Sequence, residues 1–179
     1  MQKNFTLLLL CLIGLTASVS KDIASKALFV TPQEGWRLNS SGGIEQTTDA
    51  GKSWQISYSS ENQVINDIHF LSTTDGWAVG KDALVLRWDG EKWTEVFVFA
   101  TGALHDVHLS SPEYGWAVGD RGTILHWDGT AWTAFPCPLD EALVKIEHNE
   151  TGAMRIRSQK GTLIWRERGE WQITPPASE

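Results

Sequence analysis

Carboxylates and imidazoles recur along this chain at a fixed spacing, which makes them the first candidates for chemistry. Asp67 and His69 are followed 39 residues later by Asp106 and His108, and Glu147 occupies the next position in the His series. If the innermost strands of a repeated fold bring these side chains together, they form the kind of ligand set that suits a divalent metal ion. The pattern therefore raises the possibility of a metal site on the axis of the molecule.

A structural role accounts for the same residues. Lys26 and Lys145 are expected at the level of Asp67 and Asp106, where the opposite charges would neutralise one another. The histidines could then bond to backbone or tryptophan. The sequence has no short His or Cys ligand spacing of the kind that metal sites use. We therefore expect hydrogen bonds or lysines to hold the two carboxylates, with no metal and no cofactor.

A run of basic residues near the C-terminal end is the second candidate site. Where the preceding repeat has Trp116, Val118 and Trp127, this segment has arginine in all three places. The chain carries a net charge of −7, so a basic cluster could receive an acidic protein or a glycan. Alternatively, nearby glutamates balance the arginines on a solvated face. The cluster consists of Arg155, Arg157, Lys160, Arg166 and Arg168.

Repeated elements must position these residues. Between 76–93 and 115–132, 10 of 18 aligned positions are identical at an offset of 39. The segments between turn residues are short and rich in Val, Ile, Leu and Trp, which predicts strands. The only helical candidate is a turn at 140–144. Four tryptophans share the repeat spacing: Trp54, Trp93, Trp132 and Trp171.

The repeat predicts an all-β fold, a β-propeller built of four four-stranded antiparallel blades with a 39-residue repeat. Packing between blades is the expected role of the tryptophans, and stacking on sugars is the functional alternative. The junction of blade 4 with blade 1 is expected to be the softest contact. The expected strands of the third repeat are 104–109, 115–118, 123–127 and 132–135. The blades are expected at about 21–60, 61–100, 101–139 and 140–179.

The N-terminal segment has the layout of a secretory signal. Lys3 precedes an apolar run at 5–15, and small residues then lead to an expected cleavage after Ser20. A bilayer-spanning helix needs about 20 apolar residues, so an uncleaved anchor is the less favoured alternative. A single domain at 21–179 is expected in the periplasm or outside the cell, with Cys137 as its one cysteine and no internal disulfide. The acidic charge argues against nucleic acid and anionic membranes as partners.

The first repeat contains a turn that resembles the Asp-box of bacterial neuraminidase (BNR) repeats, Ser/Thr-x-Asp-x-Gly-x-Ser/Thr-Trp. The resemblance implies a structural hairpin, in which the Asp side chain accepts backbone N–H bonds, the Gly takes a positive φ and the Trp anchors the turn. The later repeats carry a shortened version at 89–93 and 128–132. The matching residues are Thr47, Asp49, Gly51, Ser53 and Trp54.

The Gly-Trp-Ala-Val-Gly elements at 76–80 and 115–119 are similar to the repeats of the photosystem II assembly and stability factor family. This resemblance implies an exported, non-catalytic propeller that binds a protein partner as a scaffold for assembly. Such a chain could act alone or as a homo-dimer. The alternative is a carbohydrate-binding propeller or the remnant of a sialidase-like glycoside hydrolase. Sialidase chemistry needs a Tyr nucleophile, and neither Tyr58 nor Tyr114 lies where one is expected, so we expect no enzymatic activity.

Overall fold

The computed structural model describes residues 27–149 and 153–176, which form four four-stranded antiparallel sheets. Each sheet is made of four strands that follow one another in the sequence. The predicted succession of four blades is therefore confirmed. The proposed signal segment and Lys26 lie outside the described residues.

The strands are short and follow one another at regular intervals. Blade 1 contains β1 (Leu28–Phe29), β2 (Gly35–Leu38), β3 (Ile44–Thr47) and β4 (Gln55–Tyr58). Blade 2 contains β5 (Ile65–Ser72), β6 (Asp75–Gly80), β7 (Val85–Trp88) and β8 (Trp93–Glu95). Blade 3 contains β9 (Leu104–Ser111), β10 (Tyr114–Gly119), β11 (Ile124–Trp127) and β12 (Trp132–Ala134). Blade 4 contains β13 (Leu143–His148), β14 (Met154–Ser158), β15 (Leu163–Glu167) and β16 (Glu170–Thr174). Two 3₁₀ turns, η1 (Lys81–Ala83) and η2 (Asp120–Gly122), follow β6 and β10.

The predicted strands of the third repeat agree with β9 to β12 within one or two residues at each end. The predicted helical turn at 140–144 is wrong. Strand β13 begins at Leu143, which is fully buried in the apolar layer between blades 3 and 4. Packing against blade 3 therefore decides the conformation of this segment, and a register shift in the strand between Leu143 and Lys145 lets both Leu143 and Ile146 face that layer.

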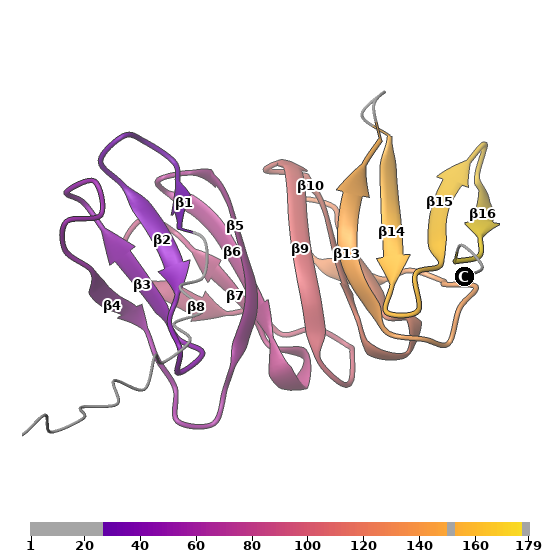
Figure 1. Ribbon diagram of the computed structural model, residues 1–179, viewed down its shortest axis with the longest axis horizontal. Coiled ribbons are helices and arrows are strands. Elements are labelled where there is room, and N and C mark those ends of the chain that lie inside the picture. Colours follow the sequence, from indigo (N-terminus) through magenta and orange to yellow (C-terminus); the bar gives the residue numbers. More distant parts are fainter. Residues whose placement is uncertain (1–26, 150–152, 177–179) are drawn as a thin grey trace, which may run out of the picture.

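The blades stand side by side in an open arc (Figure 1). The first strands of blades 2, 3 and 4, which are β5, β9 and β13, contact one another in sequence along its inner side. Blades 1 and 4 extend to opposite ends of the long axis of the molecule (Figure 1). Within the described residues, apolar layers join blade 1 to 2, 2 to 3 and 3 to 4, and none joins 4 to 1. The expected junction of blade 4 with blade 1 is therefore not formed.

Alternation along the central strands sends side chains to two different neighbours. Trp77 on β6 is 1% exposed and faces blade 3, where its ring lies 4.7 Å from that of Trp127 and 5.4 Å from that of Trp132. Ala78, the next residue, faces blade 1 and packs with Trp36. Each inner blade therefore contributes one face of its sheet to each of two apolar layers, as a period of two requires.

The four tryptophans at the repeat spacing occupy equivalent places, as predicted. Trp93, Trp132 and Trp171 lie at or near the start of the fourth strand of their blades and pack against the preceding blade. Trp54 precedes β4 in the same way, but its blade is the first in the arc. The guanidinium of Arg37 lies 4.3 Å from its ring centroid instead. Packing between blades is thus the role of three of these indoles.

The second glycine of each Gly-Trp-Ala-Val-Gly element is required by a close backbone approach. A Cβ atom on Gly80 would lie 2.2 Å from the carbonyl oxygen of Val64, and one on Gly119 would lie 2.2 Å from that of Ala103. Both oxygens belong to the segment that leads into the first strand of the same blade. These glycines therefore bring the second strand of a blade close to its first. Among the described residues, no helix has the length and apolar character needed to cross a membrane.

Candidate functional site

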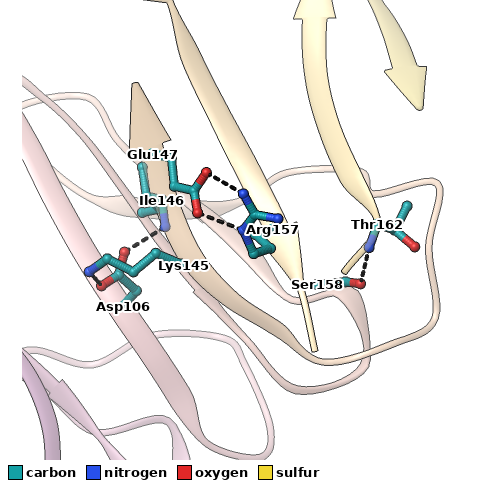
Figure 2. A network of polar contacts seen from close by, with 7 residues as sticks. All are labelled: Asp106, Lys145, Ile146, Glu147, Arg157, Ser158 and Thr162. Atoms are coloured by element: carbon teal, nitrogen blue, oxygen red, sulfur yellow. Dashed lines mark hydrogen bonds and ion pairs between the residues drawn. The ribbon is translucent and has the colours of Figure 1, made fainter. Parts of the chain in front are cut away.

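The repeated carboxylates on the inner side of the arc connect neighbouring blades. Asp67 Oδ2 on β5 accepts a hydrogen bond of 3.1 Å from the backbone N–H of Val107 on β9. Asp106 on β9 accepts the N–H of Ile146 on β13 at 2.6 Å and the ammonium of Lys145 at 2.5 Å (Figure 2). The prediction that hydrogen bonds or lysine hold both carboxylates is confirmed. Each one ties the first strand of its blade to the first strand of the next.

The two carboxylates have different electrostatic environments. Burial, together with the nearby negative charge of Asp106, raises the pKa of Asp67 to about 7. Burial opposes the charge of Lys145, but its hydrogen bond to Asp106 and the attraction between them raise its pKa overall. Lys145 and Asp106 therefore form an ion pair, whereas Asp67 relies on one backbone donor and is only partly protonated near pH 7.

Three imidazoles form a row across blades 2, 3 and 4. The ring centroids of His69 and His108 are 4.6 Å apart, and those of His108 and His148 are also 4.6 Å apart. Burial lowers the pKa of His69, and burial together with the two neighbouring imidazoles lowers that of His108 to about 4. His69 and His108 are therefore neutral near pH 7 and pack through their rings.

The expected position of Glu147 in this row is wrong. Its carboxylate turns to the outer face of blade 4, where it accepts bonds of 2.6 and 2.9 Å from Arg157 (Figure 2). His148 takes its place because the strand alternates, so the residue after Glu147 points back towards blade 3. The repeat pattern did not identify His148, because Leu109 occupies the equivalent position one repeat earlier. Within 27–149 and 153–176, no three His, Cys, Asp or Glu side chains are arranged to hold a metal ion.

The basic cluster predicted in the fourth repeat is divided between the two faces of blade 4. Arg155 and Arg157 flank Ile156, which packs against blade 3, so they lie on the outer face, where no other blade packs within the described part of the chain. Arg166 points towards blade 3, where its guanidinium lies 4.9 Å from the ring centroid of Phe135 and donates to the carbonyl oxygen of Gly169. The five residues therefore do not form one continuous patch.

The remaining members of the cluster lie in exposed turns of blade 4. Lys160 follows β14, and Arg168 lies between β15 and β16 with a φ of 52°. Both side chains belong to exposed residues. Arg157 is neutralised by Glu147. Lys160 and Arg168 are thus exposed cationic groups in turns at opposite ends of blade 4, and the half-buried Arg155 lies on β14 between these turns.

Two hollows lie elsewhere on the described part of the protein. One, of about 480 Å³, opens on the inner side of the arc and is lined by β1, β2 and β5 together with the Lys145 side chain. The other, of about 510 Å³, lies between the linker of blades 2 and 3 and strands β11 and β12. Phe97 and Phe99 on that linker are 78% and 84% exposed and contact each other edge to face. The repeat pattern did not identify this aromatic pair, because it lies outside the strands.

The turn between β3 and β4 is organised by Asp49. Its carboxylate accepts the backbone N–H of Ser53 at 2.9 Å and the Ser53 hydroxyl at 2.6 Å, and Thr47 donates to it at 2.8 Å. These bonds, led by that of the Ser53 hydroxyl, lower the pKa of Asp49 to about 2. Gly51 takes a φ of +82°. Asp49 therefore has a local structural role in shaping the turn.

Neither tyrosine considered for sialidase chemistry lies beside the inner carboxylates. Tyr58 on β4 donates to the Gln63 side chain at 2.6 Å and packs in the layer between blades 1 and 2. Tyr114 on β10 is exposed and contacts the rings of Trp116 and His126. The described residues thus place the two hydroxyls in separate structural settings.

No protein-family model and no curated protein matches the chain, but solved structures do. Over 86% of its length the chain is similar to the structure described as YCF48 bound to D1 peptide, with 18% identity and a TM-score of 0.67. It is also similar to YCF48 from Cyanidioschyzon merolae, with 18% identity, a TM-score of 0.65 and the same coverage.

The WD40 β-propeller domain of Doa1 is a further likeness, covering 85% of the chain with 10% identity and a TM-score of 0.65. The chain spans about half of each of these proteins, namely 53%, 56% and 53% of their lengths. Together these likenesses establish that this chain has the β-propeller fold, represented here by an arc of four blades.

Proposed function

We propose that this protein is an exported, non-catalytic scaffold that binds a protein partner. The observation that carries the proposal is the similarity, over 86% of the chain, to a propeller described with a bound peptide. The similarity between the Gly-Trp-Ala-Val-Gly elements and the repeats of photosystem II assembly and stability factors supports the same role. The apolar run at 5–15 and the small residues that follow it support export.

The partner surface that we propose is the basic side of blade 4. Lys160 and Arg168 are exposed in turns at opposite ends of this blade, and the half-buried Arg155 lies on β14 between them. In a chain with a net charge of −7, these cations would attract an acidic segment of a partner and disfavour basic ones. An acidic protein segment is therefore the ligand class that fits this surface best.

The absence of catalysis is part of the proposal. The inner carboxylates, which are the best placed groups for acid–base chemistry, are bonded to backbone N–H groups of the next blade. Asp49 is likewise engaged within its own turn, which supports a structural Asp-box of the BNR type. A homo-dimer would require two arcs to pack together, and whether they do depends on the side chains on the outer faces of blades 1 and 4.

Partner capture from the envelope fraction of the native cell tests the proposal. The full chain is compared with a variant carrying Arg155→Ser, Lys160→Ser and Arg168→Ser. The matched control removes three exposed positive charges elsewhere, with Lys81→Ser, Lys92→Ser and Arg121→Ser. Circular dichroism verifies that all three proteins are folded.

We expect the blade 4 variant to lose about tenfold in affinity for the captured protein, because several charge pairs are removed together. The control should bind as the wild type does, and added salt should weaken wild-type binding. Equal capture by both variants would exclude the blade 4 surface. Turnover of a glycoside by the purified chain would exclude the non-catalytic role.

A further inference from the structure

The outer face of blade 1 differs from the corresponding face of an inner blade. In blade 2, the residues that face blade 1 include Ala78 and Leu86, which are paired across β6 and β7 and are 0% and 1% exposed. The corresponding pair across β2 and β3 of blade 1 is Arg37 and Glu45. Two apolar contacts between blades have thus been replaced by opposite charges.

These charges are satisfied within blade 1. Arg37 donates to the carboxylate of Glu45 through both Nε and a terminal nitrogen, each at 2.7 Å. Its guanidinium also covers the ring of Trp54 at 4.3 Å. In the other blades, the tryptophan at this repeat position packs against the preceding blade. Arg37 therefore takes the place of a missing neighbour on this ring.

The outer face of blade 4 uses the same arrangement. In blade 3, Trp116 and Val118 face the next blade and are 7% and 0% exposed. The equivalent residues in blade 4, 39 positions later, are Arg155 and Arg157. Arg157 makes a bidentate pair with Glu147, and the guanidinium of Arg155 lies 5.0 Å from the ring centroid of Trp165. An Arg–Glu pair and an Arg–Trp contact thus cover each end of the arc.

Seating another blade on either face would bury an ion pair and displace the arginine that covers a tryptophan. Removing paired charges from water is costly unless new hydrogen bonds replace those with water. The outer face of blade 1 also carries the exposed Ile56 beside Glu45, but at the central-strand positions where the inner blades bury apolar side chains both end faces carry an arginine paired with a glutamate. Terminal repeats of stacked folds commonly carry such a polar outer face. We infer that the outer faces of blades 1 and 4 are polar caps, which keep this chain as an open four-bladed monomer.

This inference does not depend on the proposed partner and is tested by the mass of the protein in solution. Sedimentation velocity of the full chain over a dilution series is expected to give the mass of a single chain throughout. A decapped variant introduces the residues of blade 3 into blade 4, with Glu147→His, Arg155→Trp and Arg157→Val. We expect this variant to self-associate, so that its mass at least doubles as its concentration rises.

The matched control carries Glu91→His, Lys92→Trp and Lys81→Val, which make the same types of change in exposed turns of blade 2. It should remain at the mass of the wild type, and residues outside the arc contribute equally to every sample. Two results would overturn the inference. One is a wild-type dimer that the decapping substitutions dissociate, and the other is a decapped variant that is folded by circular dichroism yet stays monomeric at every concentration.

Discussion

At the scale of single residues, the structure distinguishes two carboxylates that the repeat presents as equivalent. Asp106 is compensated by the ammonium of Lys145 and a backbone N–H. Asp67 has the backbone N–H of Val107 but lies close to the charge of Asp106, and burial raises its pKa to about 7. The same residue type at the same repeat position therefore stabilises one contact between blades and weakens another at neutral pH.

We predict that Asp67→Asn stabilises the protein above pH 7. A carboxyl group whose pKa is higher in the folded state than its usual 3.8 favours folding while it is protonated, and this contribution is lost as the pH rises through about 7. The amide of Asn cannot ionise and can still accept the N–H of Val107. The expected gain in the free energy of unfolding above pH 7 is about 1–3 kcal/mol.

Urea-induced unfolding below and above pH 7 measures this effect, and Asp106→Asn serves as the matched control. That substitution removes the charge that holds Lys145 and should lower the free energy of unfolding by about 1–3 kcal/mol. If Asp67→Asn were as destabilising as Asp106→Asn at every pH, the proposed difference between the two carboxylates would be wrong.

At the scale of elements, the side chains on the two central strands of a blade determine whether another blade can pack against it. Blade 2 presents Trp77 on β6, with the guanidinium of Arg87 from β7 at 5.2 Å from its ring. Blade 4 presents Arg155 on β14 and Trp165 on β15, with the guanidinium 5.0 Å from the ring. Tryptophan and arginine have thus exchanged places between the second and third strands of the two blades. The indole on the second strand of blade 2 packs between blades 2 and 3, whereas the second strand of blade 4 carries a guanidinium that faces outward.

We predict that Trp77→Ala and Trp165→Ala have very different effects on stability. Trp77 is 1% exposed between two blades, so its truncation leaves a cavity and should cost about 3–5 kcal/mol in the free energy of unfolding. Trp165 lies on the outer face of blade 4, against which no other blade packs among the described residues, and its truncation should cost about 1 kcal/mol, mainly through its contact with Arg155. Chemical denaturation of both variants measures the difference. Similar losses would indicate that the outer face of blade 4 is covered in solution.

At the scale of the whole molecule, three apolar layers hold four blades. Blades 2 and 3 each contribute to two of these layers, whereas blades 1 and 4 contribute to one. Stability within a protein follows local burial, so segments with fewer buried contacts open more often. The arc is therefore expected to be most stable at its centre and least stable at its two ends.

Amide hydrogen exchange tests this distribution of stability. We predict that β6 and β10, which are buried on both sides, exchange about tenfold or more slowly than β1 and β16 at the two ends. The control is β11, which shares the inner position of β10 and should be protected to a similar degree. Equal protection of β16 and β10 would mean that another molecule or another part of the chain covers blade 4.

The sequence by itself determined the blades, because each blade is made of contacts between segments that follow one another in the chain. The repeat placed the strands, and it placed Trp93, Trp132 and Trp171 between blades. It also predicted that Asp106 pairs with Lys145, since the 39-residue spacing puts these residues on adjacent first strands.

Only the tertiary structure decided what the outer faces of the first and last blades contact. Whether an arginine on a central strand meets a neighbouring blade or water depends on the order and curvature of the blades, which no local pattern contains. The division of the basic cluster between two faces, the contact of His148 with His108 and the covering of Trp54 by Arg37 all follow from that arrangement. The His148–His108 and Arg166–Phe135 contacts join different blades, so only the packing of whole sheets against one another could place them, whereas Arg37 covers Trp54 within blade 1 because no other blade packs on that face among the described residues.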